Sequence, residues 1–241
     1  MTEEFKLRAR AGRRFEDEYY VEPLDDEHRS QVAGRDLAAV FAYIYRHNAW
    51  EGGESAAGEG SDLAATLAVR SALPGLLRKW RIRSILDLPC GDAGWLRSLP
   101  LGEIGYLGGD IVEEIVARNR AACPPGQGPR FEVLDLVKDE LPAADLLVCR
   151  DCLVHLPLSQ ASEALRNIAR SGCKYLLATT FLGLGRNVDI EPGDWRPLNL
   201  RLPPFGLPEP LDVIVEVDVA AIGGLPAKAL GLWDIDSFRE R

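Results

Sequence analysis

Apolar and polar positions alternate in blocks between residues 82 and 181. Five short apolar runs have the length and composition of strands, and two polar-faced stretches, 112–122 and Ser159–Arg170, have helical spacing. Ser159 is a suitable N-cap for the second helix, and Gly172 is a signal for its end. Strands separated by helices of this length predict a right-handed, parallel α/β sheet. The predicted strands are 84–88, 104–110, 130–136, 144–151 and 174–181.

The first 80 residues have a different pattern. Residues 1–35 are rich in charges of both signs, which predicts a solvated arm. Residues 36–48 carry apolar side chains at helical spacing, and the small-residue stretch 51–61 is typical of a linker. A second helix is expected after Ser61, with Pro74 marking a turn or break. We therefore expect 1–80 to form an N-terminal arm and helical cap on a main domain, 81–241.

Residues 182–210 interrupt the strand–helix alternation with many glycines and prolines. Long ordered connections of this composition are typical of lids and binding loops, so a lid insertion is predicted here. Residues 211–218 and 227–235 then alternate like two strands around Gly223 and Gly224. They predict an antiparallel hairpin at the end of the sheet.

The composition and net charge favour a globular protein that does not bind nucleic acid. The chain has 241 residues, a mass of 26.5 kDa, a net charge of −9 and a pI of about 5.0. It is long and apolar enough to bury a core, and its acidity disfavours nucleic acid as a partner. The chain has five cysteines and no apolar core of signal-peptide type near its N-terminus, which predicts reduced thiols and a cytoplasmic location. It also has no apolar run long enough to span a bilayer, which predicts no membrane contact.

The turn after the first predicted strand is the strongest candidate for a binding site. It contains Pro89, Gly91 and Gly94, a dinucleotide fingerprint with proline in place of the first glycine. Asp87 and Asp92 flank this turn, and carboxylates beside a pyrophosphate would repel it. A ligand with net positive charge, such as S-adenosylmethionine, suits the turn better than a nicotinamide dinucleotide.

The segment ILDLPCGDAGW, with Asp110 after the second strand and VLDL in the third, resembles the class I S-adenosylmethionine-dependent methyltransferases. Of the three glycines in the family's loop, this chain keeps Gly91. The resemblance implies a Rossmann-like, open, mostly parallel seven-stranded sheet with helices on both faces and an antiparallel terminal strand. It also implies S-adenosylmethionine as the cofactor.

The resemblance further assigns roles around that cofactor. Pro89, Cys90 and Gly91 would bring backbone groups to its methionine part, and Asp87 would anchor the loop and the ammonium group. Asp110, followed by Ile111, would hold the ribose hydroxyls. The adenine would meet Asp135 and the Leu136 amide, and Arg150 would line the methionine carboxylate or the adjacent wall.

Two residues after the fourth strand are alternatives for a catalytic base. His155 has a reference pKa suited to general-base chemistry, and Asp151 could act as the base or orient His155. His28 and His47 are interpreted as surface histidines. Cys149 and Cys152 have the spacing of a redox or zinc pair but lack a second pair of ligands, so no metal site is predicted.

Acceptor-binding residues are expected in the cap and the lid. Trp50, Asp194, Trp195 and Arg196 combine aromatic surface with hydrogen-bonding groups. The sequence thus predicts methyl transfer to an oxygen or nitrogen of a small molecule, with a glycosyl or secondary-metabolite hydroxyl favoured. A protein or RNA acceptor, a non-catalytic binding or regulatory protein of the same fold, and a nicotinamide oxidoreductase are the alternatives. The acceptor's identity and the oligomeric state stay open.

Overall fold

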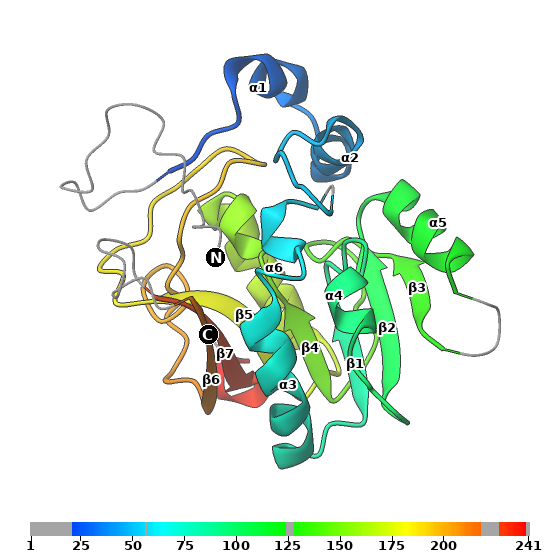
Figure 1. The fold of residues 1–241 in the computed structure, drawn as a ribbon. Coiled ribbons are helices and arrows are strands. Elements are labelled where there is room, and N and C mark those ends of the chain that lie inside the picture. The colour runs from blue at the N-terminus through cyan, green and yellow to red at the C-terminus, as the bar shows by residue number, and fades with distance from the viewer. Residues whose placement is uncertain (1–20, 56, 124–127, 218–226, 240–241) are drawn as a thin grey trace, which may run out of the picture.

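The computed structural model describes residues 21–55, 57–123, 128–217 and 227–239. Its strands form one seven-stranded sheet in the order β3-β2-β1-β4-β5-β7-β6 (Figure 1). β1 to β5 are parallel, and β7 runs antiparallel to both of its neighbours. This confirms the predicted Rossmann-like sheet and its terminal hairpin, whose glycine turn lies outside the described residues. The strands are β1 (Ser84–Asp87), β2 (Gly105–Asp110), β3 (Arg130–Val133), β4 (Leu146–Cys149), β5 (Tyr175–Leu182), β6 (Asp212–Val217) and β7 (Ala227–Asp234).

Helices cover both faces of the sheet because successive strand residues point to opposite sides. In β1, Ile85 packs with α3 (Leu67–Lys79), α4 (Gly94–Arg97) and α5 (Glu113–Ala121). Leu86 points to the other face and packs with α6 (Leu158–Arg170) and the 198–207 segment. β4 is buried along its whole length, as expected for a central parallel strand.

The N-terminal helices lie together at one end of the sheet (Figure 1). α2 (Leu37–His47) matches the predicted helix, and the Asp36 side chain caps it by accepting a hydrogen bond from the Ala39 amide. α1 (Asp26–Val32) is a helix that the charge-rich pattern of 1–35 did not indicate; Asp25 caps it. The first 20 residues of that predicted arm lie outside the described residues.

The helix expected after Ser61 begins later, and Pro74 does not end it. Residues 59–61 form a single 3-10 turn, and α3 runs from Leu67 through Pro74. Leu63 thus precedes the helix, and Leu63 and Leu67 are 46% and 60% exposed. Burial of four apolar side chains outweighs the roughly 3 kcal/mol that an internal proline costs. These side chains are Val69, Leu73, Leu76 and Leu77.

The two capping residues predicted for α6 are corrected, although the helix ends at Arg170 as predicted. The helix begins at Leu158, with Pro157 at the N-cap, and the Asp189 carboxylate accepts a hydrogen bond from the Leu158 amide. Ser159 is therefore inside the helix. Ser171, not Gly172, is the C-cap; a Cβ at Gly172 would lie 2.8 Å from the Ala143 Cβ, so this glycine serves close packing.

Residues 182–210 are packed into the molecule. Leu198, Leu200 and Leu207 belong to the core on the α6 face. Glu22 and Trp195 exchange backbone hydrogen bonds of 2.8 Å, which join this connection to the N-terminal segment. In the described part of the chain, no helix combines the length and apolar character needed to cross a bilayer.

Candidate functional site

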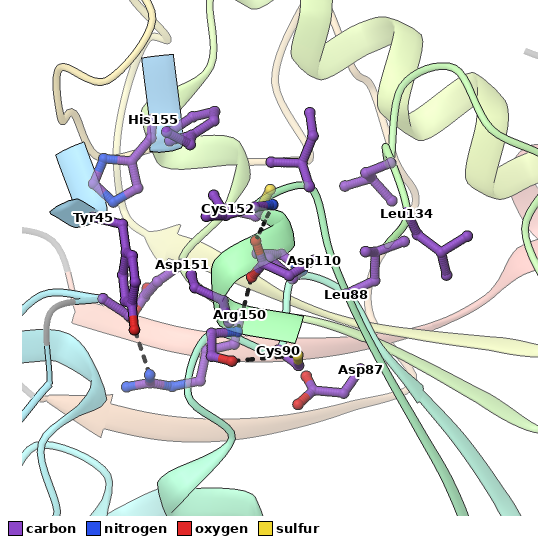
Figure 2. Close-up of a pocket in the computed structure, with 18 of the residues that line it drawn as sticks. Tyr45, Asp87, Leu88, Cys90, Asp110, Leu134, Arg150, Asp151, Cys152 and His155 are labelled. Atoms are coloured by element: carbon purple, nitrogen blue, oxygen red, sulfur yellow. Dashed lines mark hydrogen bonds and ion pairs between the residues drawn. The ribbon is translucent and has the colours of Figure 1, made fainter. Parts of the chain in front are cut away.

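A pocket lies at the carboxyl ends of β1, β2 and β4, where open α/β sheets bind ligands. Figure 2 shows side chains of the strand ends and of α2 around it. Leu37, Phe41 and Tyr45 of α2, followed by Trp50, Ala57 and Ser61, close it from the N-terminal side. The cap expected from the sequence thus contributes directly to the pocket wall.

Asp110 is buried at the end of β2 and holds the glycine loop in place. Its carboxylate accepts hydrogen bonds from the amides of Gly91 (3.0 Å) and Val112 (2.9 Å). Burial raises the pKa of Asp110 to about 6, although these hydrogen bonds oppose the shift. A ligand that donates hydrogen bonds to this carboxylate would favour its ionised form.

Asp87 is the second buried carboxylate of the pocket. It is 1% exposed, and the Tyr106 hydroxyl donates a 2.8 Å hydrogen bond to it. Burial raises the pKa of Asp87 to about 7, and the bond from Tyr106 lowers it only in part. A positively charged ligand beside Asp87 would stabilise the ionised form of this carboxyl group.

The loop between Asp87 and Asp110 can bring its backbone close to a ligand. Gly91 has a φ of +52°, and a Cβ there would lie 3.2 Å from the Ala57 Cβ of the cap. Pro89 and Cys90 line the pocket beside it. The Leu88–Pro89 peptide bond is cis, in the position where the dinucleotide fingerprint has its first glycine.

The predicted adenine and ribose residues also line the pocket: Ile111 follows β2, and Asp135 and Leu136 follow β3. The Asp135 carboxylate already accepts a hydrogen bond from the Val137 amide and lies 3.7 Å from Lys138 Nζ. The structure therefore brings the predicted cofactor residues of three strands into one pocket.

Arg150 and Asp151 follow β4 and form an ion network with the terminal hairpin. Arg150 Nε donates to Glu216 (2.7 Å), while Lys228 Nζ lies 2.6 Å from Asp151 and 3.4 Å from Glu216. Lys228 and Arg150 hold the pKa of Asp151 well below its usual range despite burial. Asp151 is therefore a permanently ionised group and a weak base.

One donor of this network has no partner. Arg150 Nη2 is buried and makes no hydrogen bond within the described part of the chain. A buried guanidinium N–H without a partner is unfavourable unless a ligand accepts from it. Arg150 lines the pocket, so the carboxylate of a methionine-like ligand matches its donor chemistry.

His155 lines the pocket beside Trp50. Its Nδ1 is 3.0 Å from the backbone oxygen of Asp194, and its ring stacks on Trp50 with centroids 4.3 Å apart. Because a carbonyl oxygen only accepts, Nδ1 carries the hydrogen in this bond. Burial lowers the pKa of His155 to about 4, so the ring is neutral at pH 7 and Nε2 has the lone pair.

Among the predicted acceptor-binding residues, the structure places Trp50 in the pocket. Asp194 forms an ion pair with Arg29, and Trp195 packs edge-on against Phe181. Arg196 is fully buried and donates to the backbone oxygens of Leu153 and Leu156, at 2.7 and 2.6 Å. These three residues do not line the pocket, and Asp194 and Arg196 support the segment that holds His155.

Other pocket features were not anticipated from the sequence. Phe41 and Tyr45 belong to the apolar positions of the predicted helix 36–48, and in α2 they line the pocket. Glu216 and Lys228 join Asp151 from the terminal hairpin, more than 60 residues away in the chain. Among the described residues, no cluster of three metal-ligating side chains occurs.

Comparison with known proteins places the fold. No protein-family model matches the sequence, and no curated protein matches it. Solved structures do match. The 1,6-didemethyltoxoflavin N1-methyltransferase of Burkholderia thailandensis, solved with 1,6-didemethyltoxoflavin and S-adenosylhomocysteine, superimposes with a TM-score of 0.61 at 16% identity, covering 93% of this chain and 99% of that one.

Two further methyltransferases show the same arrangement. The magnesium protoporphyrin IX methyltransferase of Synechocystis PCC 6803, solved with S-adenosylmethionine, has a TM-score of 0.57 at 14% identity over 83% of this chain and 98% of that one. The fold is that of the class I S-adenosylmethionine-dependent methyltransferases. The methyltransferase domain of bacterial CtHen1 also has it, with a TM-score of 0.53 at 12% identity over 70% of this chain and 99% of that one.

Within the methyltransferase fold, the pocket of this chain lies at the strand ends near the β1–β4 switch point, where the strand order reverses. The loop that has lost two glycines still has the open backbone at Gly91 and the anchoring bond to Asp110. The pocket therefore suits S-adenosylmethionine, a nucleoside that carries a sulfonium and an amino acid. It offers buried carboxylates, an unpartnered guanidinium N–H and an aromatic cap.

Proposed function

We propose that this chain transfers a methyl group from S-adenosylmethionine to an oxygen or nitrogen of a small molecule. The observation that carries the proposal is the pairing, in one pocket, of the buried carboxylates Asp87 and Asp110 with the unpartnered N–H of Arg150. They match the ammonium group, the ribose hydroxyls and the carboxylate of the cofactor. Two of the structural neighbours, the toxoflavin and porphyrin methyltransferases, have small molecules in their names, which favours a small acceptor here.

His155 and Asp151 have different roles in the proposed methyl transfer. S-adenosylmethionine, when bound, supplies an electrophilic methyl group. Burial lowers the pKa of His155 to about 4, but its neutral ring holds a lone pair on Nε2, is a stronger base than Asp151 and can take the proton of an acceptor hydroxyl or amine. Asp151, ionised beside Lys228, can accept a hydrogen bond from the acceptor and orient it. We therefore assign the base to His155 and the orienting role to Asp151.

The cofactor site is tested by calorimetric titration with S-adenosylmethionine and S-adenosylhomocysteine. We expect micromolar binding, and Asp110→Asn should weaken it by about 10- to 100-fold because charge-assisted hydrogen bonds to the ligand are lost. Asp236→Asn is the matched control, since the Asp236 side chain is 79% exposed and does not line the pocket. A folded protein that binds neither ligand would refute the proposal and favour the binding-protein alternative without this cofactor.

The assignment of the base is tested with labelled S-adenosylmethionine and a panel of phenols, glycosides and amines. With an accepted substrate, His155→Gln should lower kcat by about 10²- to 10⁴-fold and leave cofactor affinity nearly unchanged. Asp151→Asn should mainly raise KM for the acceptor. Unchanged turnover in His155→Gln would remove His155 from the mechanism, and a larger loss of kcat in Asp151→Asn would reassign the base to Asp151.

A further inference from the structure

Asp194 connects the N-terminal segment to His155 through two different parts of the same residue. Its carboxylate is 4% exposed and accepts hydrogen bonds from Arg29 Nη2 (2.8 and 3.0 Å) and the Leu24 amide (2.9 Å). Its backbone oxygen accepts the bond from His155 Nδ1. A change in the partners of the Asp194 carboxylate can therefore move the Asp194 backbone oxygen to which the His155 imidazole is hydrogen-bonded.

The neighbouring residue, Gly193, fixes the same segment from the other side. Its amide donates to the His155 backbone oxygen (3.0 Å), and its own oxygen accepts from the Trp50 indole (3.0 Å). The φ of Gly193 is +91°, and a Cβ there would lie 2.6 Å from Ile44 Cδ1 and 3.1 Å from Leu24 Cδ1. The segment thus fits tightly between His155 and the N-terminal helices.

The charges that act on His155 come from three other places. Asp151 follows β4 and favours the imidazolium form, while Arg196 and Lys228 disfavour it. On the cap side, the neutral Trp50 ring stacks on the imidazole. None of these groups selects between the two neutral tautomers as directly as the carbonyl oxygen that accepts from Nδ1.

We propose that Arg29 and Asp194 are positioning residues, whose ion pair fixes the Asp194 carbonyl and thereby keeps His155 in the tautomer with hydrogen on Nδ1. The lone pair of Nε2 is then available to the acceptor. This inference rests on the proposed function for its catalytic meaning. The tautomer itself is a property of the protein and is measurable without any acceptor.

The test is nitrogen-15 NMR of the histidine side chains, in which protonated and unprotonated ring nitrogens are distinguished. His155→Gln assigns the signal among the three histidines. We expect wild type to favour the Nδ1–H tautomer about fivefold or more, because one hydrogen bond selects it. Arg29→Met should lower this preference at least about twofold and raise the titration midpoint of His155 from near 4 toward 6.5, as water reaches the ring.

Controls and a second variant keep the test decisive. Arg46→Met removes another arginine of the same N-terminal region, one that pairs with Glu114 and not with Asp194, and should leave the tautomer unchanged. Arg29→Lys keeps a positive charge beside Asp194 and should restore the wild-type signal. Asp194→Asn keeps an acceptor for Leu24 but loses the ion pair, so it should resemble Arg29→Met.

The proposal is overturned if Arg29→Met and Asp194→Asn both fold and keep the wild-type tautomer and midpoint. It is also overturned if Arg46→Met shifts the tautomer as much as Arg29→Met does. Its failure is distinguishable from failure of the proposed function. Calorimetry on the same variants reports cofactor binding, which Arg29→Met should change less than twofold.

Discussion

At the scale of single residues, Asp87 has an environment that is unfavourable for the protein without its ligand. The carboxyl group is almost fully buried, and its pKa is raised to about 7 from 3.8. A carboxyl group with a raised pKa binds its proton more tightly in the folded state, so folding stability is lost as pH rises from about 4 to 7. Asp110, with a pKa raised to about 6, contributes in the same direction.

Replacing Asp87 should therefore stabilise the ligand-free protein. We expect Asp87→Asn to raise the free energy of unfolding at pH 8 by about 2–4 kcal/mol and to reduce the loss of stability between pH 5 and pH 8. Urea unfolding at both pH values measures this. Cofactor affinity should fall in the same variant, because the ammonium group loses its counter-charge. Equal stability of variant and wild type at pH 8 would contradict the account of Asp87.

The sequence could predict which residues lie in the pocket where the fold itself decides the direction of a side chain. Asp87, Gly91 and Asp110 stand at strand ends, and parallel strands bring their carboxyl ends together. Asp194 and Arg196 lie in an irregular connection, where the direction of a side chain has no period. Arg196 turned inward to backbone oxygens instead of toward the pocket.

At the scale of elements, α3 shows how packing overrides a local breaker. Pro74 is the eighth residue of this helix, so the Arg70 carbonyl lacks the amide partner that another residue would supply. The sequence predicted a break because it shows only the local effect of proline on a helix. The burial of Leu73, Leu76 and Leu77, which stabilises the helix, depends on the distant sheet. The same limit applies to α6, whose first amide is capped by Asp189 from another segment.

The internal proline leads to a stability prediction. Pro74→Ala should restore the missing hydrogen bond and remove the steric conflict with the preceding turn, raising the free energy of unfolding by about 1–3 kcal/mol. Thermal unfolding followed by circular dichroism measures the change. Ser71→Ala, on an exposed position of the same helix, is the control and should have a smaller effect. A lower Tm for Pro74→Ala would show that the proline contributes packing that outweighs its cost.

At the scale of the whole molecule, the pocket is made by two parts of the chain that are far apart in sequence. The sheet supplies the carboxylates, and residues 37–61 supply the aromatic cover. The sequence predicted a helical cap on the main domain, because residues 36–48 have an apolar stripe at helical spacing. It could not predict that Phe41 and Tyr45 face the pocket, since that depends on the orientation of α2 over the sheet.

Ligand binding should therefore stabilise the cover together with the loop. With saturating S-adenosylhomocysteine, we expect amide hydrogen exchange in α2 to slow by at least about tenfold, since the bound state must open before exchange. Amides of the buried face of α6, which do not line the pocket, are the internal control. If α2 exchange is unchanged while calorimetry detects binding, the ligand does not contact the cover.

The β6 edge of the sheet also bears on self-association. β6 is the edge strand beside β7, with Val213 and Val215 exposed, and such a strand is a template for pairing with another chain. Its register shifts between Val215 and Val217, and the residue at this bulge, Glu216, turns its carboxylate inward to Arg150. The bulge that completes the ion network of the pocket thus also interrupts the edge, and so protects the protein against strand-to-strand aggregation.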